Sequence, residues 1–224
     1  MKEKLKTIPL FSNLGDEHFA KILRLVRHLA FEKGAFIFNE GEPANGFYIV
    51  ETGKVKIYKL SFEGREQILH IYGPGKPFGE VPVFEGNNFP ASAMAMTKAE
   101  IIFIPREKFV KLISDTPGLA MNMLGMLSMR LREFTIQIEN LSLKEVPARL
   151  ALYILTLSRE HNKALKVTLP ISKAQLANLI GTTPETISRI LKKIADKDLI
   201  LVDGRTIVIK DYEELINLSD SGRL

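Results

Sequence analysis

The sequence predicts an α+β protein with an N-terminal antiparallel β-roll, one long helix and a C-terminal winged helix-turn-helix. Short apolar runs separated by glycines fill residues 31–105. An apolar heptad repeat follows over residues 120–141, and two capped helical segments and a hairpin pattern occupy residues 172–209. We therefore expect a roll domain over 1–116, a long helix over 117–141, a hinge over 142–146 and a second domain over 147–224.

Composition limits the classes of protein to consider. The chain has 224 residues, 46% apolar and 25% charged, which suits one large or two small domains with a buried core. It has no cysteine, which excludes disulfides, zinc fingers, thiol sensing and cysteine-ligated iron–sulfur clusters. No apolar run approaches the roughly 18 residues of a membrane helix, and no signal peptide opens the sequence. We expect a cytoplasmic protein without a membrane partner.

Residues 1–30 are expected to be helical, because Phe19, Ile22, Leu23 and Val26 form one apolar stripe. From residue 31 onward the pattern changes to short runs, which predict strands at 35–38, 46–50, 54–58, 67–71 and 101–104. Many short strands with glycine turns are typical of an antiparallel barrel or roll. Such a roll can enclose one small ligand.

A short helix over 106–116, ended by Thr116-Pro117, precedes the long helix. The long helix carries a heptad seam, typical of a coiled-coil dimer interface. The alternative is that the same residues pack against the roll. Four methionines at 121, 123, 126 and 129 flank the seam and suggest adaptable packing. The heptad seam consists of Ala120, Leu124, Leu127, Leu131, Phe134, Ile138 and Leu141.

The C-terminal domain is expected to open with a helix from Pro147 to Glu160 and a short strand over 165–169. Ser172-x-x-Gln175 is a capping box that starts a further helix, which Gly181 ends. The next helix begins either with a Thr182-x-x-Glu185 capping box or with Thr183 as the cap before Pro184. A hairpin over 199–209 with an Asp203-Gly204 turn follows, completing a winged helix.

The second of these two helices has a buried stripe and a polar face. Ile187, Ile190, Leu191 and Ile194 make the apolar stripe. The polar face consists of Glu185, Ser188, Arg189 and Lys192. In a DNA major groove, Arg can donate to guanine, Glu can accept from cytosine, and Ser can do either. The alternatives are that Glu185 only closes the helix end, and that the region is a structural subdomain.

The distribution of charge along the chain supports a DNA-binding role for this segment. Residues 142–210 contain twelve Lys or Arg and six Asp or Glu, whereas residues 211–224 carry a net charge of −3. A basic excess beside a helix-turn-helix is typical of phosphate binding. The candidate DNA-binding residues are Ser172, Thr182, Thr183, Glu185, Thr186, Ser188, Arg189, Lys192 and Lys193.

The order of roll, long helix, hinge and winged helix resembles the bacterial cyclic-AMP receptor protein and fumarate–nitrate reduction regulator (Crp/Fnr) family of transcription factors. Its motifs here are Phe78-Gly79-Glu80, the heptad helix, and the stretch from Ile180 to Arg189. The pattern Glu185-x-x-Ser188-Arg189 is similar to the fumarate–nitrate branch. That resemblance implies base reading by Glu185, Ser188 and Arg189, on a TTGA-N6-TCAA-like palindrome.

The resemblance also implies an effector pocket, with a Gly-Glu pair for a ribose and a later Arg for a cyclic phosphate. Gly79-Glu80 is present, but residues 87–92 contain no basic side chain. An anionic phosphate would be buried there without a charge partner, so cyclic AMP is disfavoured. The candidate pocket residues are Gly79, Glu80, Pro90, Ala91, Ser92, Leu124 and Leu127.

The effector is left open by the residues. Haem is one candidate, because some members of the family bind it, and the available ligands are His28, His70, Met94 and Met96. We expect a homodimeric, effector-responsive regulator that binds double-stranded DNA, and RNA polymerase too if it activates transcription. The alternative is a ligand-binding regulatory or scaffold module without DNA function. No nucleophile–base pair or metal cluster indicates an enzyme.

Overall fold

The computed structural model describes residue 6 and residues 8–11 and 14–222. The chain folds as two compact units, residues 1–131 and 132–224. Ser12 and Asn13, within the expected N-terminal helical region, lie outside the described residues.

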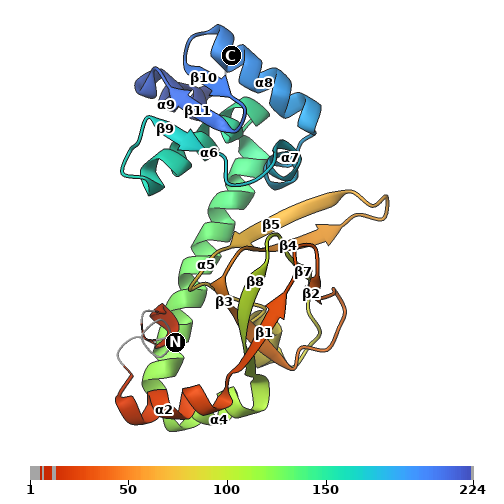
Figure 1. Ribbon diagram of the computed structural model, residues 1–224, viewed down its shortest axis with the longest axis vertical. Helices are drawn as coiled ribbons and strands as arrows, with labels where there is room; N and C mark the ends of the chain where they lie inside the picture. The colour runs from red at the N-terminus through yellow and green to blue at the C-terminus, as the bar shows by residue number, and fades with distance from the viewer. Residues whose placement is uncertain (1–5, 7, 12–13, 223–224) are drawn as a thin grey trace. The chain divides into compact units, whose positions relative to one another are not determined.

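The first unit is a β-roll of two four-stranded antiparallel sheets (Figure 1). One sheet has the strand order β1-β8-β3-β6 and the other β2-β7-β4-β5. The strands are β1 (Arg27–Phe31), β2 (Phe36–Phe38), β3 (Gly46–Thr52), β4 (Val55–Leu60), β5 (Glu66–Tyr72), β6 (Pro77–Phe78), β7 (Ser92–Ala95) and β8 (Ala99–Pro105).

Strands β3 and β8 form the centre of this unit, because both of their faces are buried. Phe47 and Ile49 on β3 pack in one core cluster, and Val50 packs in the other. On β8, Ile102 belongs to the first cluster and Ile101 to the second. Successive side chains of a strand point to opposite faces, so a strand covered on both sides is apolar throughout. This explains the unbroken run over 101–104.

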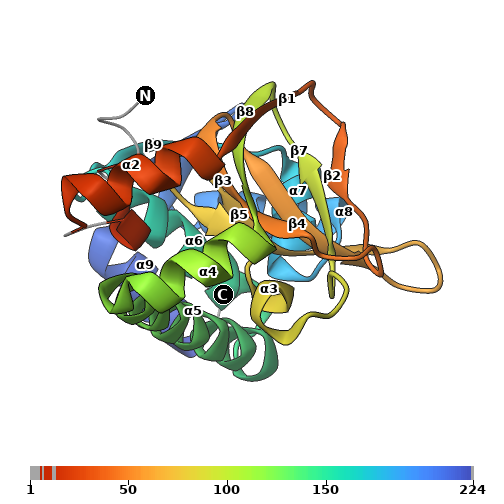
Figure 2. The same ribbon diagram turned by 90° about the horizontal axis from the view of Figure 1, so that it is seen from below.

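The first of these clusters is covered by α2 (Asp16–Leu25), α4 (Arg106–Asp115), α5 (Pro117–Leu143) and the short 3-10 helix η1 (Pro9–Phe11). Figure 2 shows α2, α4 and the start of α5 on the same side of the roll. The expectation of helix through residue 30 was wrong, because β1 begins at Arg27 and pairs with β8. Leu29 and Phe31 are its half-buried residues, a period of two that the helical stripe before them concealed.

Helix α5 uses two different stripes. Leu119, Met123 and Met126 are buried against the roll. The heptad seam is largely exposed in the single chain: Leu124 is 57% exposed, Leu131 68% and Ile138 65%. Of the seam, Leu127 is partly buried against the roll cluster. Packing on the roll is therefore done mainly by residues outside the heptad seam.

The second unit contains α6 (Val146–Glu160), the helix-turn-helix α7 (Lys173–Ile180) and α8 (Pro184–Asp196), and a three-stranded sheet. The sheet has the order β10-β11-β9 and consists of β9 (Lys166–Thr168), β10 (Ile200–Asp203) and β11 (Thr206–Ile209). A final helix, α9 (Tyr212–Ser221), which the sequence pattern did not reveal, packs on α6. Leu150, Ala151, Ile154 and Leu157 of α6 are buried, as their spacing predicts.

Elements of the roll that the sequence pattern missed are short: β6, β7 and α3 (Val81–Glu85). None of the helices among the described residues combines the length and apolarity that a membrane crossing needs.

Candidate functional site

The start of α8 is closed by Thr183. Its Oγ1 accepts a hydrogen bond from the Thr186 N–H at 3.3 Å, and Pro184 occupies the first turn. The alternative capping box of Thr182 with Glu185 was therefore wrong. Glu185 takes no part in the cap and is exposed on the helix. The structural role that competed with base reading by Glu185 is thus removed.

The helix before it is capped as the sequence predicts. Ser172 Oγ accepts from the Gln175 N–H at 3.2 Å, and Gln175 Oε1 accepts from the Ser172 N–H at 3.0 Å. Gly181 then takes φ +77°, the left-handed conformation that ends many helices and that favours glycine. Because Ser172 forms this capping box, a contact between Ser172 and DNA would use the remaining hydrogen-bonding capacity of its exposed hydroxyl.

Burial separates the faces of α8 clearly. Ile187, Ile190, Leu191 and Ile194 are all at most 5% exposed and hold the helix to its domain. The exposed side chains on the other face are Glu185, Ser188, Arg189, Lys192 and Lys193. Thr182 and Thr186 are half-buried beside them. A helix fixed by one face and polar on the other has the form of a DNA-reading element.

The wing is also present, shifted by one residue. Asp203 pairs with Thr206, so the two loop residues are Gly204 and Arg205, and not Asp203 and Gly204. Gly204 has φ +57°, a conformation that a glycine accommodates readily at the first position of a tight hairpin. The Arg205 guanidinium is bound to the Leu169 carbonyl, which ties the loop to the strand region before α7.

A second polar site lies inside the roll, at Glu80. This residue is fully buried, and its Oε1 accepts from Nη1 of Arg130, which comes from α5. Arg130 Nη2 donates to the Pro77 carbonyl at 2.9 Å, and the guanidinium lies 4.7 Å from the Tyr72 ring centre. Burial raises the pKa of the Glu80 carboxyl, and the positive charge of Arg130 partly opposes that rise. Oε2 of Glu80 is buried without a hydrogen-bond partner among the described residues.

We did not predict Arg130 as a site residue from the sequence. The family motif places the pocket cation shortly after Gly79-Glu80, whereas Arg130 follows fifty residues later. Residues 117–129 contain no charged side chain, and Arg130 is the first charge on the helix. Arg132 and Glu133 follow it closely, so this pattern by itself does not link Arg130 to Glu80.

Aromatic rings fill the roll beside the Gly79-Glu80 turn. Phe38 stacks on Phe89 with ring centres 3.7 Å apart, and Phe78 lies 6.2 Å from Phe38. Gly79 has φ +71°, and a Cβ there would meet the Phe38 and Phe89 rings at 3.2 and 3.3 Å. Glycine is therefore favoured at position 79 both by backbone conformation and by the close approach of the two rings.

The other expected pocket residues are placed less centrally. Ala91 is buried and Pro90 exposed, while Ser92 Oγ accepts from the Glu40 N–H at 3.0 Å. Leu124 is exposed on α5, and Leu127 packs in the helix-covered cluster. The structure brings Phe89 against Gly79.

The four expected haem ligands are not gathered. His28 lies on β1 in one sheet and is bound to Glu51 at 3.1 Å, and Met96 is buried after β7. His70 and Met94 lie on either side of β4, opposite Ile57 and Lys56 respectively. Because Ile57 and Lys56 are neighbours along β4, their partners face opposite sides of the sheet. Among the described residues, no group of three His, Cys, Asp or Glu side chains is arranged for a metal ion.

Comparison with known proteins agrees with this architecture. Residues 28–116 match the family described as "Cyclic nucleotide-binding domain", and residues 148–218 match the "Crp-like helix-turn-helix domain". The chain is 30% identical over 219 residues to the "CRP-like cAMP-activated global transcriptional regulator" of Mycobacterium tuberculosis, covering 96% of this chain and 98% of the relative.

Two further similarities support the same assignment. The "Cyclic AMP receptor protein" of Thermus thermophilus is 31% identical over 207 residues, covering 92% of this chain and 94% of that protein. The solved structure of FixK2 from Bradyrhizobium japonicum matches with a TM-score of 0.76 and 28% identity, covering 86% of this chain and 96% of FixK2. The chain therefore belongs to the Crp/Fnr family of DNA-binding transcription regulators, and not to a family of enzymes.

Proposed function

We propose that this regulator is a homodimer that binds a TTGA-N6-TCAA-like palindrome and responds to a small effector in the roll. The proposal rests on the exposed face of α8, where Glu185, Ser188 and Arg189 take no part in the helix cap. Residues 1–116 would serve as the effector domain, 117–141 as the dimer helix, 142–146 as the hinge and 147–224 as the DNA-binding domain.

Each polar residue of this face has a specific role on DNA. Arg189 can donate to a guanine, and Glu185 can accept from a cytosine N4 of the same half-site. Ser188 Oγ donates to the Pro184 carbonyl at 3.0 Å, so its lone pairs can accept from an adenine N6–H, and its methylene can contact a thymine methyl group. Lys192 and Lys193 add positive charge for the backbone phosphates.

The DNA part of the proposal is tested by retention on a duplex. A duplex with the TTGA-N6-TCAA palindrome should bind the wild-type protein at least 1,000-fold more tightly than a scrambled duplex of equal length, roughly the lower end of specific recognition. Both affinities are measured at one salt concentration. Equal retention of the two duplexes would reject the palindrome, and retention of neither would favour a ligand-binding module without DNA function.

The heptad seam supports dimerisation, because large apolar side chains are exposed along α5 at a strict heptad spacing. We expect Leu131→Glu with Ile138→Glu to give monomers in light scattering and to weaken operator binding roughly 100-fold, through loss of the second half-site. Both side chains are exposed in the single chain, so neither change should disturb the fold. Met129→Glu is the control, since Met129 is exposed on α5 outside the heptad seam. A monomeric wild type at micromolar concentration would contradict the proposal.

The effector is proposed to be a small molecule that donates a hydrogen bond to Glu80. The buried, unpartnered Oε2 supports this, because a buried acceptor without a partner is costly. Cyclic AMP remains disfavoured: the Arg130 guanidinium is engaged by Glu80, Pro77 and Tyr72, which leaves it poorly placed for a cyclic phosphate. Haem is the weaker candidate, because His70 and Met94 lie on opposite faces of one sheet and His28 lies in the other sheet.

Effector binding would act by shifting a two-state equilibrium between DNA-binding geometries, and the effector need only prefer one state. Arg130 is a suitable link, since it belongs to α5 and is bound to Glu80.

We further propose a cytoplasmic location and, if the protein activates transcription, contact with RNA polymerase.

A further inference from the structure

Two cationic side chains cross the hinge between α5 and α6 in opposite directions, within the second unit. The Lys144 N–H bonds to the Asn140 carbonyl, so the backbone of Lys144 continues the last turn of α5. Its Nζ, however, donates to the Ser219 carbonyl on α9 at 2.7 Å. Arg149 belongs to α6, and its Nη1 donates back to the Leu141 carbonyl of α5 at 3.3 Å. Each side chain therefore ties one side of the hinge to the other.

Lys144 caps the C-terminal end of α9. The last four carbonyls of an α-helix have no partner within the helix, and the Ser219 carbonyl lies in that last turn. A positive charge is favourable there because the carbonyl end of a helix carries partial negative charge. Asp220 Oδ1 lies 3.7 Å from the same Nζ, but its side chain is 73% exposed, so this ion pair adds little. The main partner of Lys144 is thus the end of the helix itself.

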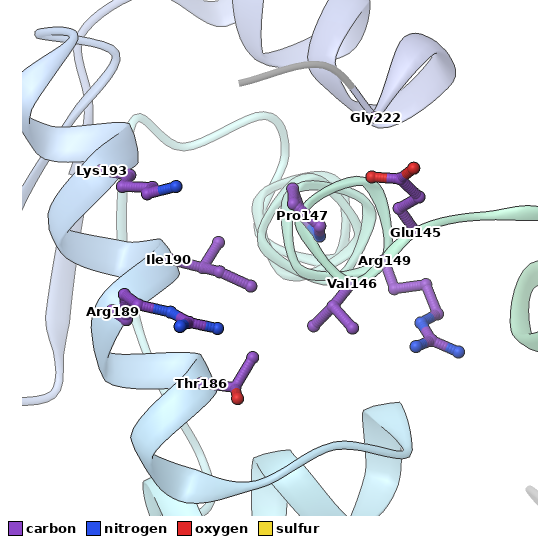
Figure 3. A pocket seen from close by; sticks show the side chains of 9 residues that line it. All are labelled: Glu145, Val146, Pro147, Arg149, Thr186, Arg189, Ile190, Lys193 and Gly222. Atoms are coloured by element: carbon purple, nitrogen blue, oxygen red, sulfur yellow. The ribbon is translucent and has the colours of Figure 1, made fainter.

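Helix α9 is fixed to α6, so a bond to α9 holds the whole C-terminal domain. The two helices pack on each other, and a Cβ at Gly222 would meet the Cβ atoms of Glu145 and Ala148 at 3.5 and 3.7 Å. Figure 3, which looks into the groove between α8 and the start of α6, shows Gly222 beside Glu145. In the same view Arg149 points away from α8. Arg149 therefore serves the hinge and not the recognition helix.

These contacts hold the angle between the last turns of α5 and α6. A change of this angle would move Lys144 with α5 and the Ser219 carbonyl with α6 and α9, which breaks a charged hydrogen bond. We propose that the C-terminal helix α9 is a regulatory brace, which holds the hinge in one geometry through Lys144 and which an effector acting on α5 has to overcome. The inference rests on the proposed function, in which this angle sets the separation of the two α8 helices in the dimer.

The test measures the hinge in the full-length protein. Because the chain has no cysteine, Glu160→Cys places a single nitroxide label on each protomer, at the exposed far end of α6. Pulsed electron paramagnetic resonance then gives the distribution of distances between the two labels of the dimer. The test variant is Lys144→Met, which keeps the length of the side chain and removes its charge and donor. Lys210→Met is the matched control, because Lys210 is paired with Asp198 in the same unit without crossing the hinge.

Lys144→Met should raise the fraction of distances outside the wild-type peak about tenfold, the effect of losing one charged hydrogen bond. Lys210→Met should keep the wild-type distribution. Addition of the operator duplex should return Lys144→Met to the wild-type peak, because two half-sites hold the two α8 helices at a fixed separation. Urea unfolding of each variant gives its stability separately from the distances.

If Lys144 only stabilises α9, Lys144→Met will lower the free energy of unfolding and leave the distances unchanged, and that result would overturn the brace while leaving the dimeric regulator intact. A Lys144→Met distribution that stays broad on the duplex would count against the brace too, because the damage would then extend beyond the hinge. A wild-type protein that shows no distance between labels, or that binds no duplex, would overturn the proposed function itself.

Discussion

Polar groups are buried and paired inside the roll, whereas they are exposed to solvent on the outer face of α8. In the roll, Glu80 and Arg130 are paired with each other, and Arg130 is further engaged by the Pro77 carbonyl and the Tyr72 ring. On α8, Glu185, Arg189 and Lys192 are exposed on a helix whose cap is made by other residues. A buried polar group affects stability strongly because water cannot replace its partner, whereas an exposed one is replaced by water at little cost.

This difference predicts which measurement each residue should affect. Changes at Glu80 and Arg130 should appear first in the free energy of unfolding. Changes at Glu185 and Arg189 should leave that free energy nearly unchanged and appear in DNA affinity. A polar site is thus assigned to folding or to recognition by comparing the two measurements on the same variant.

The largest effect is expected for Arg130→Ala, which leaves the Glu80 carboxyl buried without its cation. Removing one member of a buried ion pair costs roughly 3–5 kcal/mol. Urea unfolding of the full-length protein should show this loss, and Arg132→Ala, two residues further on and exposed, should show almost none. If both variants unfold alike, the buried pair is not a stabilising contact and the contrast between the two regions fails.

A smaller effect, and a different one, is expected for Arg189→Ala. Operator affinity should fall by about 1–3 kcal/mol, with relaxed preference at one base pair and unchanged unfolding. Lys192→Ala should instead weaken binding to all duplexes and reduce the slope of log affinity against log salt by about one. A loss of affinity that is uniform across sequences for Arg189→Ala would identify Arg189 as a phosphate contact.

The pH dependence of stability tests the environment of Glu80 more finely. Since burial raises its pKa in the folded protein, the unfolded chain releases the proton at a lower pH than the folded chain. The contribution of Glu80 to stability is therefore complete below the ordinary glutamate pKa and is lost as pH rises through the raised value. Glu80→Gln cannot titrate, so wild-type stability relative to this variant should decline over that interval. The opposite slope would mean that attraction to Arg130 outweighs burial.

The smallest expected effect concerns cyclic AMP. We expect calorimetry to detect little or no binding at micromolar concentrations, and operator affinity to stay the same when the nucleotide is added. The reason is that residues 87–92 supply no cation and Arg130 is already engaged by the protein. Micromolar binding with a gain in DNA affinity would show that Arg130 exchanges Glu80 for the phosphate.

The C-terminal half was easier to predict than the roll, for a physical reason. The helices there carry local signals: Ser172 with Gln175, Thr183 before Pro184, and apolar stripes that the structure buries. Such signals act within one or two turns, so they are readable from sequence. The start of β1 at Arg27 was missed because β1 pairs with a strand, β8, that lies far away in the sequence: Arg27 is paired with Phe103.

In the candidate site, too, the local features were predicted and the long-range contacts were not. The face of α8 follows from helix periodicity, and its exposed residues are those expected. The sequence does not decide whether Thr182 or Thr183 caps α8, because both patterns are typical of a helix start. The backbone of the structure identifies Thr183 as the cap. Arg130 lies fifty residues from Glu80, and no local pattern connects them. The stacking of Phe89 on Phe38 is a long-range contact of the same kind.

Selection of bound duplexes from a random library tests most directly whether α8 reads sequence through Glu185, Ser188 and Arg189. The wild-type protein should enrich a TTGA-N6-TCAA-like palindrome, with half-sites one helical turn apart. Glu185→Ala should change the enriched sequence while leaving the unfolding curve unchanged, because Thr183 and not Glu185 caps the helix. Enriched sites without such a palindrome, or an unchanged sequence with Glu185→Ala, would contradict the assignment.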